Sequence, residues 1–163
     1  MESAVNIENS NQGDRLLQMV IFTIAHEDFG VEILKVQEII RTLEITRVPQ
    51  APAFVEGVIN LRGKVIPVID LRRRFGIESK PHDKDTRILV IEINGMIVGF
   101  VVDSVTEVLR IPASTVEPPP SIVAGIDSEY ISGVGKLNDR LLIMIDLDRL
   151  LSEEEHQGLS NTL

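Results

Sequence analysis

Three aspartates stand where carboxylates could do chemistry. Asp70, Asp103 and Asp146 each follow an apolar segment, and paired carboxylates can serve as general acid and general base. Asp70 and Asp146, however, fall at matching positions of an internal repeat. Each precedes a short segment that we expect to be helical, where an aspartate accepts hydrogen bonds from the first free amides. We therefore interpret both residues as helix N-caps rather than as catalytic groups.

Nucleophilic, metal-binding and phosphate-binding chemistry has little support. The chain has no Cys, which excludes a thiol nucleophile and a cysteine-based zinc site. Its three histidines are scattered through expected turns and a tail, without the spacing of a metal site. The segment Gly133-Val-Gly-Lys136 lacks the glycine spacing and the Ser or Thr of a phosphate-binding loop. The sequence thus predicts a protein that is not an enzyme and that uses no cofactor or metal.

Charge limits the classes of partner. The 163 residues include 16 Lys and Arg against 25 Asp and Glu, a formal net charge of −9. This acidic balance and the few aromatic residues argue against nucleic acid as a partner. We interpret the basic run Arg72–Arg74 as a solvated helix face and Pro118–Pro120 as a stiff connection. No apolar stretch approaches the ~18 residues of a membrane helix, so direct membrane insertion is not expected.

The elements that would position these residues are mostly strands. Val and Ile supply 39 residues, and β-branched side chains fit a pleated sheet better than a helix. Four hairpins are predicted, and one of them turns at Asn94-Gly95, a dipeptide that favours positive φ angles. The hairpins span residues 17–31, 55–69, 88–102 and 130–145, and a turn at 33–36 leads into a further strand that ends at Arg41.

The sequence also contains two collinear repeats, at about residues 17–75 and 88–151. Gly57–Phe75 matches Gly133–Leu151 at an offset of 76, with seven of 19 positions identical. Upstream, the matching offset is 69, and the difference is explained by an insertion around Pro112–Ser121. Each repeat holds about five short strands, which are enough for a small barrel but only marginally stable alone.

Two apolar strands indicate how such lobes would stabilise each other. Val65–Ile69 and Leu141–Ile145 are apolar without alternation, which is typical of strands covered on both faces. We therefore expect a mostly β fold of two small lobes around a shared core, with short helices. Pro67 cannot donate a ladder hydrogen bond and is expected at an edge or a bulge. The expected boundaries are a flexible tail at 1–14, one two-lobed domain at 15–152 and a second tail at 153–163.

Several segments closely resemble CheW, the family of chemotaxis coupling proteins. They are Phe29–Ile39, Pro52–Leu71 with its specific Asn60-Leu-Arg-Gly63 sequence, Val98–Val105 and Tyr130–Gly135. The resemblance covers residues 16–152, nearly the whole chain. It implies two intertwined, five-stranded, Src-homology-like β-barrel lobes around a shared core.

The resemblance also implies a function. CheW-like proteins are non-catalytic adaptors that join the cytoplasmic tips of methyl-accepting chemoreceptors to the regulatory domain of the histidine kinase CheA. They act in the cytoplasm, at membrane-associated arrays, and hold the receptor's helical hairpin in an apolar groove near the lobe junction. The residues that carry over by position are Val36, Glu38, Arg62, Val105 and Gly133 for the receptor, and Gly57, Glu117 and Ile122 for the kinase.

Four of the receptor positions suggest how the groove is built. Val36 and Val105 are equivalent in the two repeats, so they either line the groove from both lobes or are plain core residues. Glu38 and Arg62 are expected to pair beside it. Because exposed ion pairs contribute only ~0–1 kcal/mol, this pair would orient the groove wall rather than supply affinity.

Other interpretations fit the same features. The adaptor half of a CheV-like protein would look alike, although no receiver domain follows residue 152. A CheW-like adaptor of a non-flagellar system, controlling twitching motility or a second messenger, would carry the same motifs. The remaining alternative is a barrel that binds another ligand.

Overall fold

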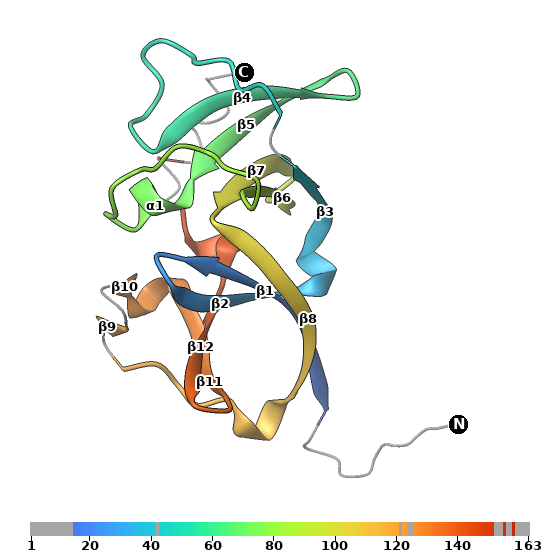
Figure 1. The fold of residues 1–163 in the computed structure, drawn as a ribbon, viewed down its shortest axis with the longest axis vertical. Helices are drawn as coiled ribbons and strands as arrows, with labels where there is room; N and C mark the ends of the chain where they lie inside the picture. Colours follow the sequence, from blue (N-terminus) through green and yellow to red (C-terminus); the bar gives the residue numbers. More distant parts are fainter. Residues whose placement is uncertain are drawn as a thin grey trace.

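Two five-stranded sheets make up most of the chain in the computed structural model, which describes residues 15–41, 43–120, 122–123, 126–151, 155 and 158. Sheet I has the strand order β3-β6-β7-β5-β4 and forms the upper lobe of Figure 1, lobe I. Sheet II has the order β11-β12-β2-β1-β8 and forms the lower lobe, lobe II. The expected tails fall outside this description, apart from Glu155 and Gly158.

Strands begin and end close to the predicted turns. Three hairpins turn at two consecutive residues with positive φ, Ala25-His26, Arg62-Gly63 and Asn94-Gly95, and the fourth turns at Asn138, whose φ is also positive. The strands are β1 Leu16–Ile24, β2 Glu27–Glu32, β3 Val36–Arg41, β4 Val55–Leu61, β5 Lys64–Asp70, β6 Arg87–Ile93, β7 Met96–Val102, β8 Ser104–Pro112, β9 Ile122–Val123, β10 Ile126–Asp127, β11 Ile131–Leu137 and β12 Arg140–Ile145. The helices are α1 Leu71–Arg74 and the 3-10 turns η1 Ile33–Lys35, η2 Ala113–Thr115, η3 Ser128–Tyr130 and η4 Leu147–Arg149.

The repeats exchange their first hairpins. β1 and β2, from the first repeat, lie in sheet II beside β8, β11 and β12, whereas β6 and β7, from the second repeat, lie in sheet I. Parallel pairing of β5 with β7, and of β12 with β2, joins each apolar strand to the hairpin of the other repeat. One repeat therefore does not make one lobe, and the two lobes are intertwined.

Irregularities in the sheets repeat with the sequence. The β3–β6 ladder shifts by one residue between Val36 and Glu38, and the β1–β8 ladder shifts at the equivalent positions, Val105 and Glu107. A bulge of this kind bends and twists a strand locally. Neither strand order closes on itself among the described residues, so the two lobes are open sheets with β3 and β8 at corresponding edges.

A shared core joins the lobes, as predicted. Its largest cluster combines buried side chains of both sheets, among them Phe22, Ile69, Phe100 and Ile143. The ring of Phe29 stacks on that of Phe22 at 5.7 Å between centroids. Smaller clusters fill the interior of each lobe separately. Because most of the large buried side chains belong to the shared cluster, burial of apolar area stabilises the two lobes together.

Pro67 lies in an inner strand, so its expected place at an edge or a bulge is wrong. Opposite Pro67, Val58 exchanges its backbone hydrogen bonds with Thr46, at 2.8 and 2.9 Å. Because both backbone groups of Val58 bond to Thr46, Pro67 and Val58 form a non-hydrogen-bonded pair of the antiparallel ladder. On the other side, the parallel ladder with β7 begins only at Val68. No donor is required where Pro67 stands, which is how an inner strand tolerates it.

Asp70 and Asp146 are N-caps, as predicted. Asp70 Oδ1 accepts a hydrogen bond from the Arg72 amide at 3.0 Å, and Asp146 Oδ1 accepts one from the Asp148 amide at 3.0 Å. Each aspartate thus starts the turn that follows the apolar strand of its repeat.

The basic run of α1 is not a solvated face, in contrast to the expectation. Arg72 forms an ion pair with Asp103, and both side chains are mostly buried. Arg74 donates to the hydroxyl of Tyr130 at 3.0 Å and to the carbonyl oxygen of Leu150, and its guanidinium lies over the Tyr130 ring. Partners distant in the sequence thus draw two of the three arginines into the protein.

Candidate functional site

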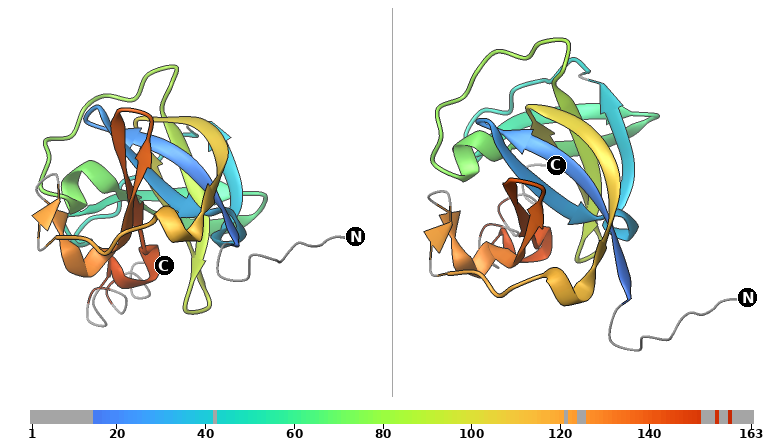
Figure 2. Two further views of the ribbon diagram at one scale, coloured as in Figure 1. Left: turned by 90° about the horizontal axis from the view of Figure 1, so that it is seen from below. Right: turned by 60° about the horizontal axis from the view of Figure 1, so that its bottom comes forward.

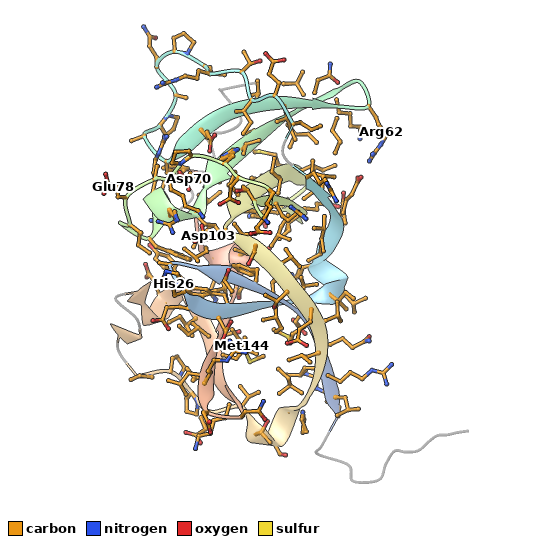
Figure 3. The ribbon with its side chains drawn as sticks, viewed as in Figure 1. His26, Arg62, Asp70, Glu78, Asp103 and Met144 are labelled. Carbon is orange, nitrogen blue, oxygen red and sulfur yellow. The ribbon has the colours of Figure 1, made fainter. Side chains whose placement is uncertain are left out.

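The first pair of predicted site residues meets at the open end of lobe I. Arg62 lies at the tip of the β4–β5 hairpin (Figure 3). It donates two hydrogen bonds to the carboxylate of Glu38 on β3, one of them at 3.0 Å. The hydrogen bonds and the charge of Arg62 lower the pKa of Glu38. The Gly63 amide donates to Asn60 Oδ1 at 2.9 Å and holds the turn. The predicted pairing of Glu38 with Arg62 is confirmed.

This ion pair lies at the mouth of a small pocket. The pocket has a volume of about 240 Å³, and both charged residues line it. Its other walls come from neighbouring strands: Gln37, Leu61, Lys64, Ile66, Val90 and Ile97. The pair therefore bridges the edge strand and the hairpin where sheet I stays open.

Lobe II has an equivalent opening without the equivalent pair. Glu107 and Asn138 replace Glu38 and Arg62 there, and Arg140 pairs instead with the buried carboxylate of Asp28 at 2.8 Å. The opening is larger, about 620 Å³, with Glu107, Asn138 and Arg140 among its lining residues. The two ends of the molecule therefore present related shapes with different charges.

Val36 and Val105 are partly buried residues that pack against the shared core. Val36 lies on β3 opposite Ile91, and Val105 lies on β8 opposite Phe22. β3 and β8 run along the same side of the molecule in all three views (Figures 1 and 2). Val36 and Val105 thus occupy equivalent places, one in each lobe, at the inner side of the two edge strands.

Gly133 and Gly57 face segments of their own chain. A Cβ atom on Gly57 would collide with the carbonyl oxygen of Thr46, and one on Gly133 would collide with the Val116 side chain. The covering segments are fixed by equivalent bridges, Thr46 to Val58 and Glu117 to Val134. The segment of Glu117 therefore covers Gly133 in lobe II, as the segment of Thr46 covers Gly57 in lobe I. Ile122 begins β9, and its side chain lies outside the described part of the chain.

Four exposed apolar residues that lie at repeat-equivalent places on the strands were not predicted from the sequence. Ile39 on β3 is 40% exposed and its equivalent Val108 on β8 is 49% exposed; Val65 on β5 and its equivalent Leu141 on β12 are 54% and 52% exposed. Val65 and Leu141 begin the two apolar strands, so the prediction that these strands are covered throughout is wrong at their first residues. The repeat alignment is the signal that could have found both pairs.

The three aspartates considered for catalysis are engaged in structural contacts. No group of three or more His, Asp or Glu side chains that could hold a metal is found among the described residues. Asp103, the remaining carboxylate considered for catalysis, is held by Arg72 and by the Ala25 amide at 2.8 Å. No helix in the described ranges is long and apolar enough to cross a membrane.

Comparison with known proteins assigns this architecture to a family. The family model of the CheW-like domain matches residues 18–155. The chemotaxis protein CheW of Klebsiella aerogenes is 41% identical over 144 residues, which cover 88% of this chain and 87% of that protein. CheW of Thermotoga maritima is 34% identical over 83% of this chain and 88% of that protein.

A solved structure agrees in fold as well. The crystal structure of the scaffolding protein TtCheW from Thermoanaerobacter tengcongensis matches with a TM-score of 0.80 and 39% sequence identity, and the match covers 91% of this chain and 96% of that one. Sequence and fold agree over nearly the whole length. The chain therefore belongs to the CheW family of chemotaxis scaffold proteins.

Proposed function

We propose that this protein is a non-catalytic adaptor that couples the cytoplasmic tips of chemoreceptors to the regulatory domain of the histidine kinase CheA, at receptor arrays. One observation carries the proposal beyond family membership. The two lobes expose equivalent edge strands, β3 and β8, each with one exposed apolar side chain, Ile39 or Val108. β4 and β11 form the opposite edges of the two sheets, so two different partners could meet the chain on different sides at once.

The receptor side is assigned to the edge strands near the lobe junction. Val36, Glu38, Arg62 and Val105 are its proposed residues, and Gly133 supports lobe II from within. A receptor helix presents apolar residues every three or four positions, which fits the apolar inner side of two edge strands. In this arrangement the Glu38–Arg62 pair keeps the β4–β5 hairpin beside β3.

The kinase side is assigned to the opposite flanks of the two sheets. Gly57, Glu117 and Ile122 are the proposed positions there. Thr46 and Glu117 form equivalent bridges over β4 and β11, so both flanks present a covering segment at the same place. A kinase domain built from similar lobes could meet these flanks in a pseudo-symmetric manner.

Two titrations by calorimetry test the proposal, one with the CheA regulatory domain and one with a receptor-tip fragment from the same genome. We expect saturable binding to each. Val36→Asp and Arg62→Glu, checked for folding by circular dichroism, should weaken receptor binding and leave kinase binding intact. If the wild-type chain binds neither partner at high micromolar concentration, the adaptor function is wrong. If these folded variants bind the receptor normally, only the groove assignment is wrong.

A further inference from the structure

Each repeat alone is half of a structure. The ladders formed within one repeat are mainly those of its hairpins, such as β4–β5 in the first repeat and β6–β7 in the second. The ladders that cross from one repeat to the other are β1–β8, β2–β12, β3–β6 and β5–β7. Sheet I and sheet II therefore each require strands of both repeats.

The surface between the repeats is apolar, with charges that match across it. In the shared core, Phe22 and Ile69 of the first repeat are buried together with Phe100 and Ile143 of the second. Ion pairs also cross between the repeats, namely Asp28–Arg140, Lys35–Asp148 and Arg72–Asp103. A first repeat is thus complementary to a second repeat, whether that second repeat belongs to the same chain or to another copy.

The chain passes from the first repeat to the second through residues 75–86, between α1 and β6. Most of these residues are exposed, and the connection runs on the outside of the molecule (Figure 2). Polar contacts hold its start to the first repeat: Ser79 donates to Asp70 at 2.8 Å, and the Glu78 carbonyl oxygen accepts from Arg72 at 3.1 Å. The rest of the connection, residues 80–86, spans about 20 Å when extended, which lets β6 lie in a neighbouring body.

We propose that the first repeat of one copy pairs with the second repeat of another, which gives a repeat-exchanged dimer. Each of its two bodies contains a complete sheet I and sheet II, with the ladders, core and ion pairs of the monomer. Only the course of residues 80–86 and their local contacts, such as the His82–Glu56 pair, differ. The dimer carries every surface of the monomer twice, so it can join two copies of any partner of this protein.

Protein concentration decides between the two forms. The connection holds the two repeats of one chain at an effective concentration on the order of millimolar. At micromolar concentration the wild-type chain therefore stays mostly monomeric. Exchange requires refolding at high concentration, because the ladders that cross between the repeats must open first. The inference does not depend on the adaptor function, and its test needs no partner protein.

Two complementary variants test the exchange in the full chain. Arg72→Glu brings two carboxylates together and Asp103→Lys brings two cations together, whether the variant is a monomer or pairs with itself. If the two variants are unfolded, mixed and refolded together, a dimer that exchanges repeats between them restores an attractive pair in both bodies. We expect at least about tenfold more dimer in the mixture than in either variant refolded alone. Light scattering measures the mass against 18.1 kDa for one chain, and native mass spectrometry identifies the two chains.

A second set of variants avoids the buried pair. Lys35→Glu and Asp148→Lys change a pair whose side chains are 46% and 36% exposed, so both variants should fold alone. Because exposed pairs contribute little, we expect a smaller increase of dimer in their mixture, about threefold. The matched control is Glu38→Arg mixed with Arg62→Glu, because this exposed pair lies within the first repeat. Exchange of repeats cannot bring these two substitutions together, so their mixture should contain no more dimer than the separate variants.

The single-chain double variant Arg72→Glu/Asp103→Lys shows whether the reversed buried pair is tolerated, and it should refold as a monomer. If it does not fold, the Lys35–Asp148 set decides alone. Enrichment of a one-to-one dimer in a crossing mixture, without enrichment in the control mixture, supports the exchange. If no crossing mixture contains more dimer than its components, the inference is wrong. Equal enrichment in the control mixture also overturns it, because the chains would then associate through their surfaces. Neither result bears on the binding of receptor or kinase by the monomer.

Discussion

Arg72 and Asp148 occupy the same position in the two repeats and carry opposite charges. Each is the second residue after an aspartate N-cap. Each also forms an ion pair with a residue at a point where the chain crosses from one sheet to the other: Arg72 with Asp103, between β7 and β8, and Asp148 with Lys35, in η1 between β2 and β3. In the first pair the basic residue follows the N-cap, and in the second pair the acidic residue does, so the two ion pairs have opposite polarity. If two copies of the first repeat packed against each other, Lys35 would face Arg72 instead of Asp148. These charges therefore favour packing of the first repeat against the second.

The Arg72–Asp103 pair should contribute more to stability than the Lys35–Asp148 pair. Arg72→Ala leaves a mostly buried carboxylate with the Ala25 amide as its remaining donor, and we expect a loss of about 2–3 kcal/mol in the free energy of unfolding. Lys35→Ala removes a partly exposed pair and should cost ~0–1 kcal/mol. Urea unfolding of both variants measures the difference, and equal losses would contradict this ranking.

Stability should depend on pH through Asp103. Burial raises the pKa of this carboxyl, but the hydrogen bonds from Arg72 and the Ala25 amide outweigh burial and hold its pKa below the ordinary value of 3.8. A pKa lower in the folded than in the unfolded state adds stability above the unfolded value, and this stability is lost as the pH falls through the folded value. The stability gap between wild type and Asp103→Asn should therefore be full near pH 6 and shrink below about pH 4.

Unfolding at a series of pH values checks this dependence. The control is Gly135→Ala, a change on β11 that removes no titratable group. Its stability difference from wild type should stay flat over the same range. A gap for Asp103→Asn that stayed constant down to pH 3 would show that the pair does not lower this pKa on folding.

Local signals predicted the hairpins, the caps and the repeat, but not the exchange of hairpins. Periodicity in β6 and β7 identifies strands, yet the same pattern results whether the hairpin folds back on its own repeat or on the other one. The β5–β7 and β12–β2 pairings that decide the matter are parallel and distant in sequence. They depend on packing of the shared core, which no short window of sequence contains.

The site was predicted unevenly for the same reason. Glu38 and Arg62 were matched through the family motif rather than through a local pattern, because they lie 24 residues apart, on edge strand β3 and at the tip of the β4–β5 hairpin. The roles of Arg72 and Arg74 were misjudged because their partners, Asp103 and Tyr130, lie 31 and 56 residues further along the chain. A run of three arginines appears solvated until those partners are known.

Glycine at positions 57 and 133 should be required for stability, in addition to its place at the proposed partner surfaces. Gly57→Ala pushes a methyl group into the Thr46 carbonyl, and Gly133→Ala pushes one into the Val116 side chain. Overpacking of this kind costs about 1–3 kcal/mol, which thermal or urea unfolding can resolve.

Gly135→Ala is the matched control for these variants. It lies two residues from Gly133 on β11, and its new methyl group would meet Leu142 Cβ at an ordinary 4.0 Å. We expect a change within about 0.5 kcal/mol. If Gly133→Ala is as stable as Gly135→Ala and still loses receptor binding, Gly133 contacts the partner directly.

Reversing the charges of the Glu38–Arg62 pair should show whether the pair orients the β4–β5 hairpin or itself contributes to affinity for the receptor tip. Both side chains are solvent-accessible and the pair is screened, so Arg62→Glu should leave the unfolding midpoint unchanged within error. It should nevertheless weaken binding of the receptor tip, because two facing carboxylates would push the β4–β5 hairpin away from β3. The double variant Glu38→Arg/Arg62→Glu restores an attractive pair, and we expect it to recover most of the lost affinity.

Recovery is what distinguishes the two roles. If the pair only positions the hairpin, either orientation of the charges serves, and the double variant binds almost as wild type does. If Arg62 itself touches the receptor, the double variant stays as weak as Arg62→Glu, because the partner still meets a carboxylate at the hairpin tip. Calorimetric titration of the three proteins with one receptor-tip fragment gives the answer, and their affinity for the CheA regulatory domain provides the internal control.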